Sequence, residues 1–454
     1  MDETESTRQL YLFQPLKQRS VEARFDGGRM TSDGGSLLVR EVAERTGILK
    51  TFARCFIDHR DPDLIEHTVE ELVAQRVYGI ICGYEDLNDH DQVRHDPIFS
   101  ALVGKEEVLA SRSTLNRLEL SRPASAAEER YKKIVCDFKK VERLLVTAFL
   151  DSLPKVFGRL IIDLDATDFT LYGHQEGRFF HGFYGDYCYL PLYITCGDHL
   201  LAAKLRVSNI DAAAGALEEV QRIVMQIRGR YPHAKILLRA DSGFARDALM
   251  TWCEENNVDY LFGLAKNERL IKEIQNSLAQ AEQLFVSSGG MPARVFTEFR
   301  YQTLDSWSQE RRVIAKAEYL EKGSNPRFVV TSLSKRTAQA MELYEQWYCK
   351  RGDMENRINE QLQLFAHRMS TNTMRANQIR LWFSSVAYLL LTQLRLKALK
   401  GTALARAHVN TIRNKLIKIG ARVSVSVRRF YVSFASAFAF QEVFNAAYAN
   451  LRAP

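Results

Sequence analysis

Three aspartates lie within six positions of one stretch, IIDLDATDFT, at residues 161–170. They are Asp163, Asp165 and Asp168, and like charges this close together repel each other unless something compensates them. Alternate residues of a β-strand share one face, so Asp163 and Asp165 point the same way, whereas Asp168 lies beyond the expected strand end. The spacing alone leaves open which of the three does chemistry.

A fourth carboxylate, Asp241, closes the strand-like run KILLRAD, and Ser242-Gly243 after it permits a sharp turn. Aspartates at the ends of neighbouring strands could chelate a hard cation, and Mg²⁺ prefers carboxylate oxygens. A strand-end aspartate can equally form a turn or cap a helix, so the spacing keeps both interpretations open.

A third ligand could come from the helical stretch at residues 343–365. There Tyr348, Arg351 and Glu355 are spaced i, i+3 and i+7, so they share one helix face. An acid, a guanidinium and a phenol on one stripe suit a metal ligand beside a phosphate-contacting pair. The alternative is an ordinary surface ion pair between Arg351 and Glu355.

The elements that must position these residues follow an α/β pattern. Strand-like and helical runs alternate between Arg159 and Asn267 in the order β, β, β, α, β, α, β, and Gly197-Asp198 marks an antiparallel hairpin near the start. We expect five segments: a mainly helical region at 1–150, the first part of the α/β core at 151–267, a strand-rich insertion at 268–336, the C-terminal helices of the core at 337–400 and a basic tail at 401–454.

The charge of the chain is unevenly distributed. From Arg395 onward there are eleven Lys and Arg residues and one acid, Glu442, so this segment carries a charge of about +10. The whole chain carries a net charge of +7, so the rest of the chain is slightly negative. A basic tail on a near-neutral body indicates a polyanionic partner, or simply a solvated basic face.

Cysteine usage and hydropathy indicate the compartment. The seven cysteines are scattered without a C-x-x-C pair, which argues against a disulfide framework or a zinc cluster. The N-terminus has no apolar signal core, and the longest apolar helix, Leu381 to Leu394, is too short to span a bilayer. We therefore expect a soluble, cytoplasmic protein with no membrane partner.

Five stretches of the sequence together form a recognisable pattern: DLDATD, QEGRFFHGFYGDYCYLPLYITCGDHLLAAKLR, RADSGF, VDYLFGLAKN and YCKRGDMEN. The chain resembles the DDE transposases of bacterial insertion sequences, specifically the group named insertion sequence thirteen-eighty. The resemblance runs from about Phe25 to Lys397 and includes the family signature Tyr-x-x-Arg-x-x-x-Glu at Tyr348, Arg351 and Glu355.

The resemblance implies a ribonuclease-H-like catalytic domain interrupted by a β-strand insertion. It implies a catalytic and metal-binding triad of Asp165, Asp241 and Glu355 with two Mg²⁺ (or Mn²⁺) ions. Asp165 is favoured over Asp163 because the related motif Asp-small-Thr matches Asp165-Ala166-Thr167. The family also places a lysine seven residues after the glutamate, where this chain has Leu362.

The partners implied by the resemblance are nucleic acids, and the mainly helical region at 1–150 would serve DNA binding and dimerisation. We expect the enzyme, a homodimer on DNA in the bacterial nucleoid, to cut double-stranded DNA at terminal inverted repeats and join the ends to target DNA. Tyr348 and Arg351 would contact DNA, and the basic tail would contact phosphates through Arg406, Arg413, Lys415, Lys418, Arg422, Arg428 and Arg429.

Trp307 in the insertion is a second kind of DNA-binding candidate. It lies near Arg311, Arg312 and Lys316, and an aromatic ring beside cations suits stacking on an unpaired base near the cut. The alternative is that Trp307 packs between the strands of the insertion.

Other functions fit parts of the pattern. DLDAT also matches the Asp-x-Asp-x-Thr motif of haloacid-dehalogenase-type phosphatases, in which Asp163 would be the nucleophile and Asp165 the acid, but the downstream acidic pair of that family is missing, with Ala202 where its second acid would stand. A catalytically silent DNA-binding protein derived from a transposase, or a nuclease without strand transfer, remains open.

Overall fold

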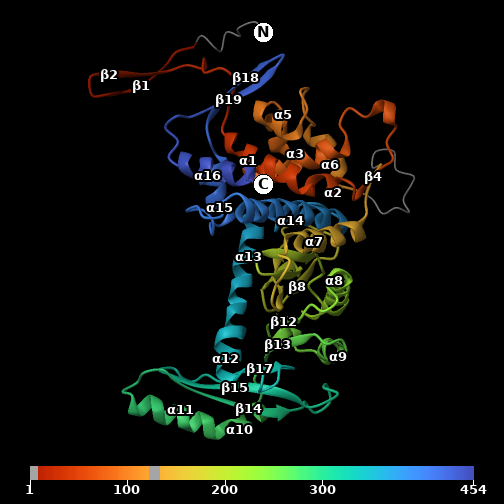
Figure 1. Cartoon of the computed structure of the whole chain (residues 1–454), viewed down its shortest axis with the longest axis vertical. Helices are drawn as coiled ribbons and strands as arrows, with labels where there is room; N and C mark the ends of the chain where they lie inside the picture. The colour runs from red at the N-terminus through yellow and green to blue at the C-terminus, as the bar shows by residue number, and fades with distance from the viewer. Residues whose placement is uncertain (1–8, 122–132, 454) are drawn as a thin grey trace. The chain divides into compact units, whose positions relative to one another are not determined.

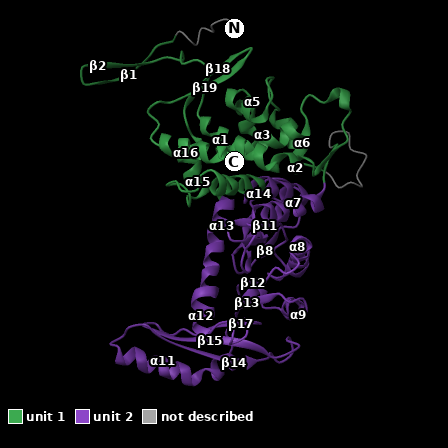
Figure 2. Cartoon of the chain, viewed as in Figure 1, with its two compact units in different colours: residues 1–136, 363–365, 386–454 green, residues 137–362, 366–385 purple. Residues whose placement is uncertain are grey.

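The computed structural model describes residues 9–121 and 133–453 (Figure 1). The chain divides into two compact units (Figure 2). Unit 1 comprises residues 1–136, 363–365 and 386–454, and unit 2 comprises residues 137–362 and 366–385. The sequence-based boundary at residue 150 therefore lies inside a helix of unit 2, and the C-terminal segment shares a unit with the N-terminal one.

A nine-stranded sheet forms the centre of unit 2, in the order β11-β10-β6-β12-β13-β17-β15-β14, with β16 paired to β15. The core strands are β6 (Leu160–Ala166), β10 (Leu192–Cys196), β11 (His199–Lys204), β12 (Ile236–Ala240) and β13 (Asp259–Leu264). Strand β6 is parallel to β12 and antiparallel to β10, and β12 is parallel to β13. An antiparallel hairpin followed by parallel strands is the expected ribonuclease-H-like arrangement, and the α/β fold class is confirmed.

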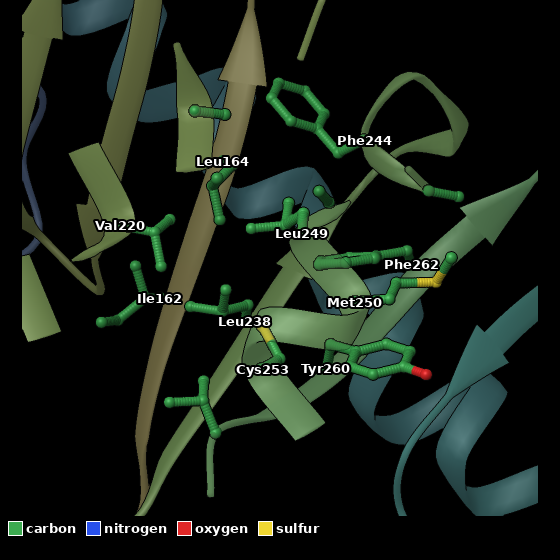
Figure 3. Packing of buried hydrophobic residues seen from close by; sticks show 14 of the residues in the cluster. Ile162, Leu164, Val220, Leu238, Phe244, Leu249, Met250, Cys253, Tyr260 and Phe262 are labelled. Carbon is green, nitrogen blue, oxygen red and sulfur yellow. The ribbon is translucent and has the colours of Figure 1, made fainter. Parts of the chain in front are cut away.

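The two faces of the sheet follow from the period of two along each strand. Ile162 and Leu164 of β6 point into one core together with Leu238 of β12, and Figure 3 shows them packed against Val220 and Met250. That face is covered by the helices α7 (Phe138–Ser152), α8 (Ala216–Arg230) and α9 (Asp247–Glu255). The intervening residues of β6, including Asp163 and Asp165, therefore face the opposite side.

The opposite face carries a smaller core and an irregular helix. Ile161 and Leu237 pack there against Leu343 and Tyr344. The helix runs without interruption through α12 (Ala340–Glu342), a π-helical segment (Leu343–Tyr348), a 3₁₀ segment (Cys349–Gly352) and α13 (Asp353–Leu362). This rod stands beside the sheet in Figure 1.

The insertion continues the central sheet rather than forming a sheet of its own. Its strands are β14 (Ala293–Tyr301), β15 (Arg311–Leu320), β16 (Gly323–Ser324) and β17 (Arg327–Thr331), and β17 pairs with β13 of the core. The insertion opens with two helices that the expectation of a strand-rich segment did not include, α10 (Glu268–Glu273) and α11 (Gln275–Ser287). A small sheet of β7 (Phe169–Thr170), β9 (Asp186–Tyr189) and β8 (Phe179–His181) completes unit 2.

Unit 1 is mainly helical, as expected, but it also contains β-structure. Its helices are α1 (Leu37–Thr46), α2 (Ile48–Ala53), α3 (Val69–Cys82), α4 (His90–Val93), α5 (Pro97–Val103), α6 (Arg112–Glu119), α15 (Val409–Ile412) and α16 (Gln441–Arg452), and α14 (Met374–Lys397) is shared with unit 2. Its strands are β1 (Tyr11–Leu16), β2 (Arg19–Ala23), β3 (Met30–Thr31), β4 (Phe56–Asp58), β5 (Ile134–Cys136), β18 (Ala421–Ser426) and β19 (Arg429–Phe434).

Two sequence-based expectations need correction in this part of the chain. The run AAEERYKKIVCDFKKVERLLVTAFLDSL, from residue 126 onward, has the pattern of one long amphipathic helix. The helix begins only at Phe138, capped by Asp137, because Ile134–Cys136 pairs as a strand with Phe56–Asp58; residues 122–132 lie outside the described range. The basic C-terminal segment is a folded part of unit 1 rather than a tail. Arg413 is buried and donates to the carbonyls of Ile80 and Ile81.

All seven cysteine thiols are free. No helix in the described part of the chain is both long enough and apolar enough to cross a membrane.

Candidate active site

Strand β6 brings two carboxylates to the same face of the sheet. The side chain of Asp163 is buried and paired with Arg239 of the adjacent strand β12, with Nε–Oδ1 and Nη2–Oδ2 distances of 2.5 and 2.8 Å. Arg239 also donates to the backbone carbonyl of Trp347 at 2.5 Å. One guanidinium thus links β6, β12 and the irregular helix, and these are the three elements that carry Asp165, Asp241 and Glu355.

Asp165 lies two residues further along β6, and its carboxylate is less completely satisfied. Its Oδ1 accepts from the backbone N–H of Ala166 at 2.9 Å, and its Oδ2 lies 3.2 Å from Nη1 of Arg351. Burial raises the pKa of Asp165 to about 6; Arg351 lowers it, and the negative charges of Asp241 and Glu355 raise it further. The negative charge of the Asp165 carboxylate is therefore only partly offset by Arg351.

Asp241 follows strand β12 directly, as the sequence predicts. Its Oδ1 accepts from the backbone N–H of Gly243 at 2.8 Å, which holds the short 3₁₀ turn Ser242–Phe244. The turn-forming role that the sequence left open for this residue is thus real. It uses one carboxylate oxygen, and Oδ2 remains for another role.

The Tyr348 side chain comes close to the turn after Asp241 because Gly263 has no side chain at this point. A Cβ atom built on Gly263 of β13 would lie 2.5 Å from the Tyr348 hydroxyl oxygen and 2.8 Å from the backbone nitrogen of Ser242. Burial raises the pKa of Tyr348, and the nearby charge of Asp241 raises it further while Arg351 lowers it. Gly263 is therefore required for the close approach of helix and strand at this point.

Arg351 is the positive charge at the centre of the cluster. Burial alone would lower the pKa of Arg351, but the charges of Asp165, Tyr348, Asp241 and Glu355 outweigh burial and raise it. Glu355 itself is exposed at the start of α13. The structure thus places Arg351 in contact with Asp165, and Asp241 and Glu355 lie close enough to influence both electrostatically.

The donor set of this cluster fits a hard divalent cation. Three carboxylates share one electrostatic neighbourhood, because burial raises the pKa of Asp165 and the charges of Asp241 and Glu355 raise it further, and carboxylate oxygens are ligands that Mg²⁺ prefers. Among residues 9–121 and 133–453, however, no three His, Cys, Asp or Glu side chains are close enough together to hold one ion as they stand. Arg351 supplies the counter-charge to Asp165 in this arrangement.

The DNA-binding candidates of the insertion lie elsewhere, in internal contacts. Trp307 is only 6 % exposed and packs edge-on against Tyr301, with ring centroids 5.8 Å apart. Arg311 is buried and pairs with Asp247 and Glu254 of α9. With its ring in the core, Trp307 cannot stack on a base in this conformation, and the packing alternative describes it.

Arg312 and Lys316 have similar internal partners. Arg312 pairs with Glu298 and donates to the carbonyl of Leu333 at 2.8 Å. The Lys316 ammonium lies 2.8 Å from Glu318. The structure therefore does not present these cations as a free DNA-binding surface.

The position of the missing signature lysine is occupied by Leu362, the last residue of α13. Arg357 on the same helix contacts Asp198 of the β10–β11 turn at 2.6 Å and Glu360 at 3.1 Å. The Arg357 guanidinium is thus paired with Asp198 and Glu360.

Comparison with known proteins decides the family. A family model described as "Transposase DDE domain group 1" matches residues 13–454, nearly the whole chain. The chain belongs to the DDE transposases. The narrower assignment to the insertion sequence thirteen-eighty group is compatible with this match and stays a prediction.

Other comparisons add little to the DDE transposase assignment. No curated protein matches the chain. Among solved structures, a cryo-EM structure of the piggyBac transposase synaptic complex with hairpin DNA aligns over 94% of this chain and 83% of that chain, at 10% identity and a TM-score of 0.40. A TM-score of this size carries no structural argument.

Two residues of this DDE transposase site were missed in the sequence, Arg239 and Gly263. An arginine in the middle of the buried run KILLRAD needs a buried acid as its partner, and that requirement was a usable signal pointing to Asp163. Gly263 gave no comparable signal, because glycine in a strand has several explanations.

Proposed function

We propose that this transposase cuts DNA at the ends of its insertion sequence and joins the freed ends to target DNA by metal-assisted phosphoryl transfer. The observation that carries the proposal is the electrostatic cluster of Asp165, Asp241, Glu355 and Arg351 at the C-terminal ends of β6 and β12. Its acids match the family triad one by one.

In this proposal Asp165, Asp241 and Glu355 hold Mg²⁺ or Mn²⁺, two ions per site. Bound there, the ions would activate the attacking oxygen and stabilise the leaving oxygen of the phosphodiester. Glu355 is exposed on its helix and Arg351 is half-buried, so both side chains can readjust when cations and DNA enter.

The protein groups around the cluster have separate tasks. Arg351 offers a planar guanidinium suited to a phosphate once its single contact to Asp165 is released. Tyr348 is fixed against Gly263 and can donate its hydroxyl proton to a phosphate oxygen. Little covalent chemistry is required of the chain, so its contribution is positioning and charge neutralisation.

The reaction balances as two displacements at phosphorus. Water first attacks the phosphodiester at the element end, and the 3′-oxygen leaves and takes a proton. The freed 3′-hydroxyl then attacks a target phosphodiester, forming one P–O bond and breaking another. The DNA partners are duplexes with terminal inverted repeats and a target duplex, with the protein acting as a homodimer.

The test uses the DNA on both sides of the gene, incubated with the full chain and Mg²⁺, with cut ends and joined products mapped at nucleotide resolution. We expect cuts at inverted repeats and joined products. Asp165→Ala, Asp241→Ala and Glu355→Ala should each abolish cleavage while DNA binding survives. The control Asp151→Ala removes a surface acid paired with Arg230 and should cleave normally.

The outcomes separate the alternatives. Cleavage without joined products would mean a nuclease, and binding to the repeat ends without any Mg²⁺-dependent nick would mean a catalytically silent DNA-binding protein. Full cleavage by one of the three alanine variants would remove that residue from the triad.

A further inference from the structure

Strands β18 and β19 form a hairpin in unit 1, drawn in blue in Figure 1, and its two faces differ in chemistry. Alternate residues of a strand share one face, and so do residues directly opposite each other on paired strands. By this register the apolar face consists of Ala421, Val423, Val425, Phe430, Val432 and Phe434. The basic face consists of Arg422, Ser424, Ser426, Arg429, Tyr431 and Ser433.

The apolar face is turned toward the rest of unit 1. Ala421 is buried, and the Phe434 ring packs against Phe444 of α16 with ring centroids 5.1 Å apart. A Cβ atom built on Gly34 would lie 3.0 Å from the Phe434 ring and 3.1 Å from the Ala421 side chain. The basic face therefore points to solvent, and all of its residues except Ser433 are exposed.

The arginines of this hairpin have no internal counter-charge. Arg422, Arg429 and the turn residue Arg428 are exposed, and in residues 9–121 and 133–453 no carboxylate pairs with any of them. The hairpin itself contains no acid. By contrast, Lys418 just before it pairs with Asp33 at 2.7 Å. The positive charge of the hairpin is thus available to a polyanionic partner.

The dimensions of the hairpin favour duplex DNA among polyanions. Its strands lie about 4.8 Å apart, and the major groove of B-DNA, about 12 Å wide, admits a two-stranded ribbon. Arg422 and the Ser426–Arg429 pair are four residues apart along the strand, about 14 Å, close to the rise of four base pairs. The major groove of A-form RNA is too deep and narrow for side chains to read.

We propose that the basic face of the hairpin enters the major groove of the terminal repeat and reads its bases. Arg422 and Arg429 each bind O6 and N7 of a guanine, at two positions about four base pairs apart. The hydroxyls of Ser424 and Tyr431, opposite each other between the two arginines, donate to and accept from the intervening base edges. This inference rests on the proposed function in one respect, that repeat ends are the partner, and it does not require that the DNA be cut.

The first measurement is binding in EDTA, so that cleavage plays no part. Two duplexes of roughly two helical turns are compared, one with the inverted repeat that flanks the reading frame and one with the same base pairs shuffled. We expect the full chain to prefer the repeat. Arg422→Met and Arg429→Met should each lower this preference about 5- to 150-fold, the range for one bidentate arginine–guanine pair.

The second measurement identifies the groove. Dimethyl sulfate methylates guanine N7, which lies in the major groove. We expect the wild type to protect guanines about four base pairs apart in the repeat. Arg422→Met should lose protection at one of these guanines, and Arg429→Met should lose it at the other.

Two controls match these variants. Arg54 at the end of α2 is an exposed arginine of the same unit, and no carboxylate pairs with it in the described part of the chain, so Arg54→Met removes the same charge. Val425→Ser changes the opposite face of the same hairpin. Both variants should keep the preference for the repeat and the protected guanines.

Three outcomes would overturn the proposal. One is an unchanged preference in both hairpin arginine variants, checked to melt like the wild type. Another is equally weakened binding to both duplexes with guanine protection intact, which would make the arginines phosphate contacts. The last is an equal loss of preference in Arg54→Met.

The failure of this proposal can be told apart from failure of the proposed function. Repeat binding with the protected guanines but no Mg²⁺-dependent cleavage by the wild type would leave the hairpin's role standing and reject the transposase reaction. Cleavage at the repeats together with full preference in Arg422→Met/Arg429→Met would reject the hairpin's role alone.

Discussion

Strand β6 carries two carboxylate–guanidinium pairs two residues apart, and they differ in burial and geometry. In the pair of Asp163 and Arg239 both side chains are 7 % exposed, and two hydrogen bonds join them. In the pair of Asp165 and Arg351 the exposures are 13 % and 21 %, and one contact of 3.2 Å joins them. Both pairs lie on the same face of the same sheet.

The difference separates structural charge from functional charge. Arg239 donates two hydrogen bonds to Asp163 and also binds the helix at Trp347, so this pair fixes the three elements of the site, although burial raises the pKa of Asp163 as well. Asp165 is left with weaker compensation and a raised pKa near other acids. The proposed function would use such a weakly compensated carboxylate, held in place by a more strongly paired neighbour.

The largest loss of stability is expected when the Asp163–Arg239 pair is broken. Arg239→Met leaves Asp163 charged and buried without a partner, so we expect the free energy of unfolding to fall by about 3–5 kcal/mol. Arg351→Met removes a single contact between less completely buried side chains and should lower the free energy of unfolding by less than Arg239→Met does. Denaturant unfolding of both variants at pH 7 measures the contrast.

A matched control for Arg239 is Arg311. The Arg311 side chain is also buried, and it pairs with two acids, Asp247 and Glu254. Arg311→Met should destabilise the protein comparably, yet the remaining folded protein should cleave DNA with an unchanged metal requirement. Equal stability losses in Arg239→Met and Arg351→Met would contradict the distinction between the two pairs.

A smaller effect of opposite sign is expected at Asp165. The pKa of Asp165 in the folded protein, about 6, lies above its ordinary value of 3.8. The folded state therefore binds more protons than the unfolded state between about pH 6 and pH 4, and stability rises as the pH falls through this window. Asp165→Asn should raise the stability of the metal-free protein at pH 8 by about 2–3 kcal/mol and remove this pH dependence.

Asp163→Asn provides the comparison for that measurement. The substitution leaves the buried guanidinium of Arg239 without its carboxylate partner, so it should lower stability at pH 8 instead of raising it. Thermal unfolding of both variants in EDTA at several pH values gives the result. A destabilised Asp165→Asn at pH 8 would show that its charge is already satisfied.

The smallest expected effect concerns Gly263. Gly263→Ala places a Cβ atom against the Tyr348 hydroxyl and the turn after Asp241, so we expect a loss of about 1–3 kcal/mol from overpacking. Cleavage should fall more than stability does, because the turn and Tyr348 shift together. A variant that cleaves normally with wild-type stability would mean that the close approach of helix and strand is not needed.

Local patterns made most of the core predictable. The alternating run around Asp163, the Gly197-Asp198 hairpin and the strand ending at Asp241 each carry their own period and turn signal, and the structure confirms them as β6, the β10–β11 turn and β12. The cluster of Asp165, Asp241 and Glu355 was reached through the family resemblance. Their electrostatic influence on one another is observed, and their catalytic role stays a prediction.

Contacts between distant segments could not be predicted. Trp307 and Arg311 look the same in the sequence whether they face DNA or lie inside the protein, where Arg311 pairs with Glu254 of α9, nearly sixty residues earlier. In the same way, the pairing of β17 with β13 and the burial of Arg413 depend on partners far along the chain. The local sequence identifies the residue types, but contacts with distant segments determine their roles.

The most direct test of the two-pair account compares Mg²⁺-dependent DNA cleavage by two folded variants. In Asp163→Leu/Arg239→Met the buried pair is replaced by apolar side chains, which often costs little stability; in Asp165→Asn only the unsatisfied carboxylate is changed. We predict that the double variant still cuts at the inverted repeats, at a reduced rate, and that Asp165→Asn does not cut. Cleavage by Asp165→Asn, or none by a well-folded double variant, would contradict the account.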